Sequence, residues 1–187
     1  DAVHYSPHGI MDVKDLDCDF LSFSMYKLFG PHGIAFMYGK KDILEHLNPY
    51  RPWPHHDESP KKYDIGTPNM EGLESSRAVF EYIRKEIAEK YGQTFKKEYE
   101  EKGFSDNRLL YKMGMRAIWE YERSLVEHLN ETLTKLNKVR IFGITDKNKL
   151  NLRVPTYSIN FPQISCTDLC KALAKENIYV WNGEDGV

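Results

Sequence analysis

The sequence predicts an α/β protein, and three observations support this prediction. Short apolar runs of strand length lie near both ends of the chain. A long stretch with helical spacing of its apolar residues fills the middle. The last third alternates helix, strand, strand, helix and strand, which is typical of a small α/β layer structure. With 187 residues, the chain can form one average domain or parts of two small ones.

The first part of the chain begins with two expected strands. The apolar runs 19–25 and 33–38 are separated by the turn Gly30-Pro31-His32-Gly33, which predicts two neighbouring strands. A short helix is expected at 41–47. The segment 48–69 contains five prolines, so we predict a long irregular loop. A loop of this length is more often functional than idle.

Helices are expected through the middle of the chain. Apolar spacing predicts a helix over 72–90, and Gly103 then interrupts the pattern. Ser105 is a candidate N-cap for the next segment, which we interpret as one long helix or two abutting helices. We therefore place a domain boundary near Gly103, with a first domain at 1–103 and a second at 104–187.

In the last third of the chain, the predicted strands and helices alternate. Strands are expected at 139–143 and 156–161. A helix is expected at 165–176, with Ser165 as its N-cap. A final apolar run at 178–181 predicts a third strand.

Composition narrows the class of protein. The formal net charge is −2, so no strong field attracts the chain to nucleic acid or to a membrane surface. No apolar run approaches the ~18 residues needed to span a bilayer, and we expect no secretory signal. An odd number of cysteines argues against a disulfide framework and fits a reducing compartment. We expect a cytoplasmic globular protein without a nucleic-acid or membrane partner.

Lys27 is the first candidate catalytic residue. It follows the predicted strand 19–25, in a loop that also holds Ser24, Tyr26 and Gly30. A lysine that is desolvated at the end of a buried strand loses its proton more easily and can form a Schiff base. The Ser24 hydroxyl can bind an anion. The simpler alternative, which position alone favours, is a solvated loop lysine.

Two further pairs are candidate ligand contacts. Asp1 and His4 stand three residues apart and could face one ligand, although such a pair is more often solvated. Gly66 and Thr67 precede the predicted helix 72–90, where a hydroxyl, backbone amides and the helix dipole can contact a phosphate. A turn followed by a helix cap is the simpler alternative for that pair.

Several short segments occur in an informative order. In the first half they are Asp1-Ala2-Val3-His4, Asp19-Phe20, Ser24-Met25-Tyr26-Lys27, Gly30-Pro31-His32-Gly33 and Gly66-Thr67-Pro68-Asn69. In the second half they are Ala117-Ile118, Tyr121-Glu122, Val139-Arg140-Ile141-Phe142-Gly143, Arg153-Val154-Pro155-Thr156 and Ile178-Tyr179-Val180-Trp181-Asn182-Gly183. Together they resemble the class V aminotransferases, and within that family the cysteine desulfurase-like branch. The resemblance covers nearly the whole chain in the right order, which makes it far more specific than any single motif.

The resemblance implies a fold and a cofactor. These enzymes bind pyridoxal 5′-phosphate and have the fold type I of such transferases. By this likeness, 1–103 would be the C-terminal part of the large, cofactor-binding domain and would contribute part of its sheet, with a dimer and cofactor loop at 48–71. The segment 104–187 would be a truncated small α/β domain at the C-terminus. Because the family's phosphate-cradling turn and ring-stacking aromatic residue lie upstream of Asp1, we expect a partial chain that lacks the N-terminal half.

The resemblance also implies roles for single residues. Lys27 would carry the Schiff base to the cofactor and move the proton at the substrate Cα. Asp1 would pair with the pyridine nitrogen, and His4, the second candidate catalytic residue, would be the polar partner of the ring hydroxyl. Ser24 and Tyr26 would bind the cofactor phosphate.

The same likeness implies an oligomeric state. In the family, the Gly-Thr pair reaches the phosphate of the neighbouring subunit's cofactor. Gly66 and Thr67 therefore imply a homodimer with shared active sites.

The implied activity is that of a transferase or lyase acting on a small amino acid, but the chain departs from the desulfurases at two places. Trp181 and Asn182 stand at the end of the last predicted strand, where many relatives have an arginine that clamps the substrate carboxylate. We interpret Cys18, Cys166 and Cys170 as buried thiols rather than as a mobile persulfide carrier. Transamination, elimination, desulfuration and racemisation all stay open.

No metal site is expected. His4 and His8 are four residues apart, but Pro7 prevents the helix that would align them. His55-His56-Asp57-Glu58 is rich in ligand atoms, but it lies in the predicted irregular loop without distant partners.

Two alternatives to an active enzyme stay open. One is a catalytically silent fragment or pseudo-enzyme that serves as a dimerisation or interaction module. The other is one half of a split enzyme whose remaining part is another polypeptide. The intact Lys27, Asp1 and Ser24 favour the enzyme.

Overall fold

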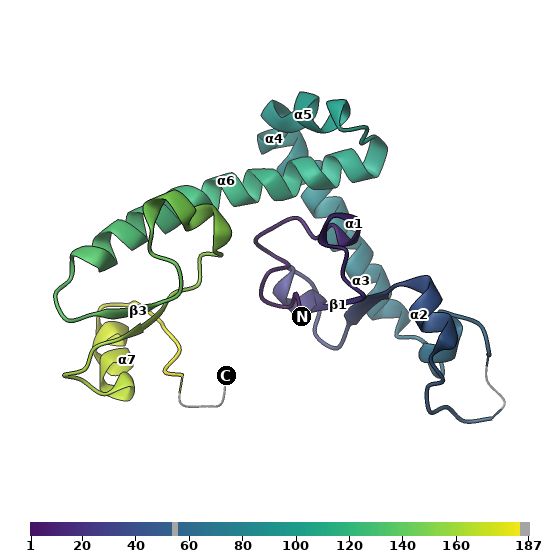
Figure 1. The fold of residues 1–187 in the computed structure, drawn as a ribbon, viewed down its shortest axis with the longest axis horizontal. Helices are drawn as coiled ribbons and strands as arrows, with labels where there is room; N and C mark the ends of the chain where they lie inside the picture. Colours follow the sequence, from purple (N-terminus) through teal and green to yellow (C-terminus); the bar gives the residue numbers. More distant parts are fainter. Residues whose placement is uncertain (54–55, 184–187) are drawn as a thin grey trace. The chain divides into compact units, whose positions relative to one another are not determined.

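A computed structural model describes residues 1–53 and 56–183 of the chain (Figure 1). The chain forms two compact units, Asp1–Glu120 and Tyr121–Val187. The division falls inside the long helix α6 (Asp106–Lys135), which begins in the first unit and ends in the second. Each unit has its own small sheet.

A β-hairpin lies at the centre of the first unit. Strand β1 (Phe20–Ser24) pairs antiparallel with β2 (Ala35–Gly39), so that Phe20 faces Gly39 and Ser24 faces Ala35. The prediction of two neighbouring strands is confirmed. The short helix α2 (Lys41–His46) follows β2 as expected, and α1 (Val13–Leu16) precedes β1. The loop after α2 contains only the helical turn η2 (Lys61–Tyr63) in its described part.

The predicted helix over 72–90 is confirmed and is longer than expected. It consists of α3 (Met70–Glu81), the π-helical segment η3 (Tyr82–Ala88) and α4 (Glu89–Tyr91), which follow one another without a break. Two elements that the sequence did not predict come next, the turn η4 (Gln93–Phe95) and the helix α5 (Lys96–Glu101).

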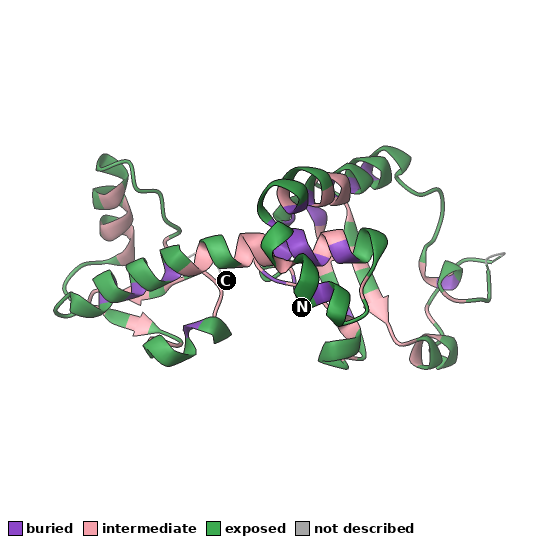
Figure 2. Cartoon of the chain, turned by 90° about the horizontal axis from the view of Figure 1, so that it is seen from above, coloured by how far each residue is buried: buried purple, intermediate pink, exposed green. Residues whose placement is uncertain are grey.

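The core of the first unit lies where the Lys27 turn, the α3–α4 helix and α6 meet. Its larger cluster consists of Met25, Leu28, Val79, Ile83 and Met115, and a second cluster consists of Ala88, Tyr99, Leu109 and Met113. Figure 2 shows the buried segments of these helices. Both clusters are small, and many apolar side chains of this unit remain exposed.

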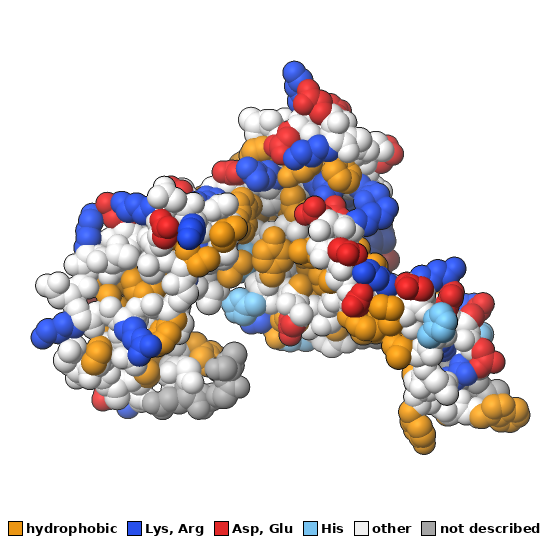
Figure 3. Space-filling model, viewed as in Figure 1, with side chains coloured by type: hydrophobic (Ala, Val, Ile, Leu, Met, Phe, Trp, Pro, Cys, Tyr) orange, Lys and Arg blue, Asp and Glu red, His pale blue; other side chains and the backbone are white. Residues whose placement is uncertain are grey.

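Exposed apolar residues are prominent in the loop that follows α2. Tyr50 and Trp53 are 99% and 93% exposed, respectively. Hydrophobic side chains project from this loop in Figure 3. Aromatic side chains of this size are normally partly buried in a folded assembly, so the loop presents a surface that can pack against another molecule.

The second unit contains a hairpin and a helix. Strand β3 (Arg140–Phe142) pairs antiparallel with β4 (Ser158–Asn160), and η5 (Lys147–Leu152) lies between them. Helix α7 (Cys166–Lys175) starts at Ser165, whose hydroxyl accepts a hydrogen bond from the Asp168 amide at 3.1 Å. The predicted strands and the predicted cap are confirmed.

The prediction of a strand at 178–181 is wrong. In the structure this segment belongs to no strand, and Tyr179 and Trp181 are 81% and 74% exposed. The residues have strand-forming side chains, but a strand also needs a partner for its backbone groups. Among the described residues, the sheet of this unit contains only β3 and β4.

None of the described helices is both long enough and apolar enough to span a bilayer.

Candidate active site

Two buried residues fix the turn that carries Lys27. Met25 and Leu28 have no exposed side-chain surface. The backbone amides of Leu28 and Gly30 both donate to the Met25 carbonyl oxygen, at 2.9 and 2.8 Å. Because Met25 and Leu28 anchor the turn in the core, the two residues between them, Tyr26 and Lys27, remain on its outer side, where both are exposed.

Polar and aromatic groups gather on this outer side. The ring of Tyr26 stacks on the imidazole of His32, with ring centroids 4.9 Å apart and an interplanar angle of 13°. The Lys27 Nζ lies 5.4 Å from the centroid of the same Tyr26 ring. Ser24 ends β1 directly before the turn. The structure therefore brings an amine, a phenol and an imidazole together, next to a strand end that carries a hydroxyl.

Sequence reasoning missed His32 as a member of this group. The sequence pattern predicts only that His32 lies in the turn between two strands. The signal that could have found it is the hairpin itself, because the register that pairs Ser24 with Ala35 returns the chain to the side of Tyr26. An aromatic residue in the return of such a turn is well placed to stack on Tyr26.

The expectation that Lys27 is desolvated at the end of a buried strand is not met. Lys27 is exposed, and in β1 only Leu21 is buried, while Phe20 is 45% exposed. A two-stranded hairpin leaves much of its surface open unless other elements cover it. The exposed Lys27 has no ion pair or hydrogen bond through its amine among the described residues.

The N-terminal segment lies beside β1. The amide of Ala2 donates to the carbonyl oxygen of Ser22 at 2.8 Å. The Asp1 Oδ1 atom accepts the amide of Val3 at 2.8 Å. This arrangement places Asp1 and His4 on a segment hydrogen-bonded to the strand that ends at Ser24.

Gly66 and Thr67 occupy a separate place in the first unit. Both are exposed, and Gly66 has a φ of 87°, a conformation that favours glycine. Thr67 lines a cleft of about 580 Å³ together with Gly33 and Tyr63. Lys27 is not among the residues that line this cleft. Thr67 and Lys27 therefore do not line this cleft together.

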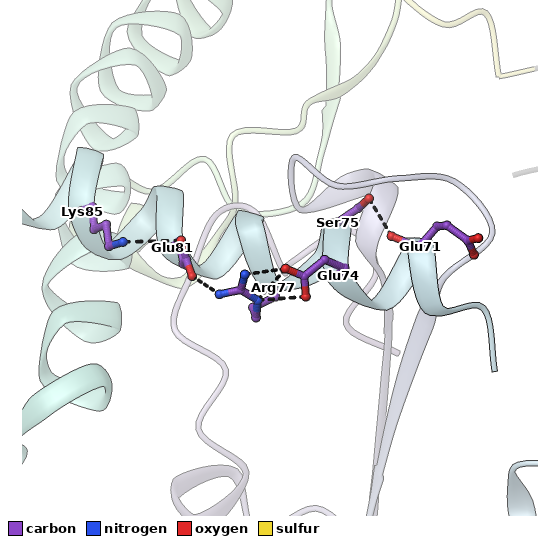
Figure 4. A network of polar contacts seen from close by, with 6 residues as sticks. All are labelled: Glu71, Glu74, Ser75, Arg77, Glu81 and Lys85. Carbon is purple, nitrogen blue, oxygen red and sulfur yellow. Dashed lines mark hydrogen bonds and ion pairs between the residues drawn. The ribbon is translucent and has the colours of Figure 1, made fainter.

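Helix α3 starts directly after the Gly-Thr loop. The Asn69 Oδ1 atom caps it by accepting the amide of Gly72 at 2.9 Å. Its outer side carries a ladder of ion pairs in which Arg77 contacts Glu74 and Glu81 (Figure 4). Most of the charges on this surface of α3 are therefore compensated by neighbours on the same helix.

Nothing in the described residues assembles a metal site. Within 1–53 and 56–183, no three histidine, cysteine, aspartate or glutamate side chains are clustered as ligands would be. His4 and His8 have ring centroids 6.3 Å apart. His55, part of the ligand-rich sequence in the loop, lies outside the described residues.

Comparison with known families matches the chain over almost its entire length. The model of the family described as aminotransferase class V matches residues 1–102 and 106–187. A protein called cysteine desulfurase from Pectobacterium atrosepticum is 27% identical over 153 residues, which is 75% of this chain and 31% of the relative.

Two other relatives match nearly the full chain. The cysteine desulfurase of Haloferax volcanii is 26% identical over 98% of this chain and 38% of its own length. The probable cysteine desulfurase of Staphylococcus epidermidis (strain RP62A) is 27% identical over 98% of this chain and 40% of its own length. The chain thus spans less than half of the length of these curated relatives.

A solved structure shares the fold. The cysteine desulfurase CsdA of Escherichia coli, in its S-sulfonic acid form, superposes with a TM-score of 0.65. The match covers 95% of this chain and 39% of that protein, at 24% identity. The fold of this chain is therefore one that occurs within a longer protein.

Proposed function

The chain belongs to the class V aminotransferase family, whose enzymes use pyridoxal 5′-phosphate, and we propose that it supplies the catalytic lysine, Lys27, of such an enzyme. The proposed activity is that of a transferase or lyase acting on a small amino acid. When bound, the cofactor supplies an electron sink for negative charge at the substrate Cα. The residues of this chain would hold the cofactor and move the proton.

The placement of Lys27 carries the proposal. A covalent bond to the cofactor needs a primary amine that is accessible and not held by a carboxylate. Lys27 is exposed, and among the described residues its amine contacts only the face of Tyr26. The buried Met25 and Leu28 fix the backbone of the turn on which it stands. The same amine would move the proton at the substrate Cα.

The neighbouring donors fit the other groups of the cofactor. Ser24 and Tyr26 would donate hydroxyl hydrogen bonds to its phosphate, because phosphate oxygens accept such bonds readily. Asp1 would face the pyridine nitrogen, where a carboxylate stabilises the protonated form. His4 would contact the ring hydroxyl. The hydrogen bond from Ala2 to Ser22 supports these roles, because it ties the Asp1–His4 segment to the strand that ends at Ser24.

A homodimer with shared sites would give Gly66 and Thr67 a role. They are exposed on the proposed dimer and cofactor loop at 48–71, and Lys27 does not line the cleft that Thr67 lines. The exposed aromatic residues Tyr50 and Trp53 of the same loop would be covered by the partner subunit. Gly66 and Thr67 would then reach the partner's cofactor phosphate through a backbone amide and a hydroxyl.

We propose a small amino acid as the substrate and leave the type of reaction open. The relatives named cysteine desulfurase point to sulfur removal as one outcome. Cys18, Cys166 and Cys170 are half-buried free thiols, which does not favour any of them as a mobile sulfur carrier. Transamination, elimination and racemisation use the same lysine and remain within the proposal.

Trapping on Lys27 tests the proposal. The purified chain is mixed with pyridoxal 5′-phosphate, reduced with borohydride, and its peptides are mapped by mass spectrometry. We expect a visible absorbance band at roughly 410–430 nm, and a reduced adduct on Lys27. The variant Lys27→Arg should lose both, whereas Lys41→Arg, at a lysine that is 85% exposed, should keep both.

The opposite result would favour the alternatives. An adduct spread evenly over surface lysines, Lys41 included, would show that this chain has no cofactor site of its own. It would then be a silent module for dimerisation or interaction, or one part of an enzyme that needs a second polypeptide.

A further inference from the structure

A groove on the first unit lies outside the proposed active site. It has a volume of about 440 Å³ and runs between the α1 region, helix α3 with η3, and the start of α6. None of the proposed cofactor residues lines it. Its volume falls within the range of pockets that bind small molecules, roughly 300–1,000 Å³.

Asp12 and Lys112, which both line the groove, form an ion pair with each other. The Lys112 Nζ lies 2.6 Å from the Asp12 Oδ2, and both side chains are largely buried. The hydrogen bond and the charge of Lys112 lower the pKa of Asp12. Asp12 is the only acidic residue among those that line the groove, so this pair leaves no carboxylate for the other cations.

Three further cations of the groove have no acidic partner. Lys14, Arg84 and Arg108 all line it, and none forms an ion pair within the described residues. Arg84 uses its Nε to donate to the Phe80 carbonyl oxygen at 3.1 Å, and its remaining nitrogens have no partner in this part of the chain. Arg108 lies over the ring of Phe104, with its Cζ 5.6 Å from the centroid.

Cations without an acidic partner are unusual in the first unit. Elsewhere in the first unit, exposed lysines and arginines are mostly paired with a carboxylate three or four residues away, as Arg77 and Lys85 are on α3 (Figure 4). In Figure 3, Lys and Arg side chains gather beside α1. Three uncompensated charges around one concavity create a positive potential that an anion can lower.

Aromatic side chains form another part of the groove. Phe80 and Tyr111 both line it, with ring centroids 5.9 Å apart. Burial raises the pKa of Tyr111 to about 12, so its hydroxyl adds no negative charge to the groove at physiological pH. Ile10 and Val13 add apolar surface. A ligand for this groove therefore needs an apolar or aromatic body as well as a negative charge.

We propose that the groove binds a small organic anion, an aromatic ring bearing a phosphate or a carboxylate. The ring would lie against Phe80 and Tyr111, and Arg84 and Arg108 would bind the anionic group. Guanidinium groups suit this role because their planar fork matches both phosphate and carboxylate oxygens. The inference does not depend on the proposed cofactor chemistry.

Calorimetric titration of the full chain with phenyl phosphate and with benzoate tests the proposal and separates the two anionic groups. We expect a Kd of roughly 0.1–1 mM for at least one of them. Benzyl alcohol, which has the ring without the charge, and inorganic phosphate, which has the charge without the ring, should both bind at least about tenfold more weakly.

Variants locate the binding. Arg84→Gln and Arg108→Gln should each weaken it by about tenfold, and Asp12→Asn should strengthen it because Lys112 would become a fourth free cation. Arg77→Gln, on the same helix but outside the groove, and Ser24→Ala, at the proposed cofactor site, should leave it unchanged.

Two results would overturn the proposal. One is affinity that does not change in either arginine variant while thermal melting shows that both are folded. The other is equal affinity for benzyl alcohol, which would mean that the groove recognises only apolar surface. Because Arg108 is exposed, its replacement carries little risk of unfolding the chain.

Discussion

The Lys62 ammonium group donates a hydrogen bond of 2.7 Å to the carbonyl oxygen of Leu47. It also donates to the carbonyl oxygen of Glu45 at 3.0 Å, and the neighbouring Tyr63 hydroxyl donates to the Leu44 carbonyl oxygen at 2.6 Å. Lys62 is only 5% exposed. Carbonyl groups at the end of a helix lack partners within it, so the loop side chains complete the C-terminal end of α2 and are held in place by it.

Lys62→Met should release the loop that carries the Gly-Thr pair. Methionine keeps the apolar stem but leaves the two carbonyl oxygens without a donor, at a cost of about 2 kcal/mol in the free energy of unfolding. Hydrogen exchange should speed up at the amides of 58–69 and stay unchanged in β1 and β2.

Lys61→Met is the matched control for this loop. Lys61 is exposed and pairs with Glu58, so its replacement should cost less than about 1 kcal/mol. Equal exchange rates in the two variants would mean that Lys62 does not hold the loop.

Gly114→Ala should destabilise the first unit, although alanine normally favours a helix over glycine by about 1 kcal/mol. A Cβ atom at Gly114 would lie 2.6 Å from the carbonyl oxygen of Ile83 and 2.8 Å from its Cγ2. Since a backbone oxygen cannot swing away as a side chain can, α6 would have to shift from η3. We expect a loss of roughly 1–3 kcal/mol, measured by urea unfolding.

Ser124→Ala is the control for Gly114→Ala, because it also introduces an alanine into α6 but at an exposed position. It should change stability by less than about 0.5 kcal/mol. If Gly114→Ala were as stable as this control, the close contact between α6 and η3 would not exist in solution.

The contact at Gly114 also shows where prediction from the sequence stops. The hairpin, the long helices and the cap at Ser165 follow from apolar spacing and local chemistry, and the structure has them. The π-helical form of Tyr82–Ala88 was not predicted, since it accompanies a close approach between two helices that are distant in sequence. Helix α5 was missed because Tyr99 is its only buried residue, which gives no periodicity.

The candidate site likewise has some features that the sequence predicts and others that it does not. The position of Lys27 on a turn after a strand was predictable from an apolar run and a glycine turn. Its exposure was not, because that depends on how much of β1 other elements cover. The stack of His32 on Tyr26 depends on the hairpin register, and 178–181 forms no strand because no neighbouring strand pairs with it among the described residues. Each of these is a tertiary property that local sequence does not encode.

The Asp12–Lys112 pair should make stability depend on pH. The pKa of Asp12 is lowered in the folded chain, mainly by its hydrogen bond from Lys112. A lowered pKa means that the pair stabilises the fold above the unfolded pKa of about 4, and that this contribution disappears as the pH falls through the folded value. Asp12→Asn should therefore cost about 2 kcal/mol at pH 7, and the difference from the parent chain should shrink below about pH 4.

Urea unfolding at several pH values measures this difference. Asparagine caps a helix about as well as aspartate, so the N-terminal end of α1 is kept. Glu98→Gln removes one partner of the exposed pair with Lys102 and should cost less than about 1 kcal/mol. A constant difference between Asp12→Asn and the parent chain from pH 7 to pH 3 would contradict the role of the pair.

Mixed oligomers test whether Gly66 and Thr67 serve the partner's site, as the proposed function requires. A Lys27→Ala chain retains Thr67, and a Thr67→Val chain retains Lys27. If sites are shared, a mixed dimer contains one site with both residues and one site with neither. Thr67 is exposed, so valine there should not unfold the chain.

We expect Lys27→Ala alone to trap no cofactor at position 27 on borohydride reduction, and Thr67→Val alone to need about tenfold more pyridoxal 5′-phosphate, as for the loss of one hydrogen bond to a charged group. Mixing the two should restore trapping on Lys27 at the concentration that the parent chain requires, in up to half of the Lys27-bearing sites. Mixing Thr67→Val with a chain that carries both substitutions should restore nothing, because neither partner then offers Thr67. Normal trapping by Thr67→Val alone would show that the hydroxyl does not contact the phosphate. A deficit that mixing leaves unchanged would place Thr67 and Lys27 of the same chain at one site.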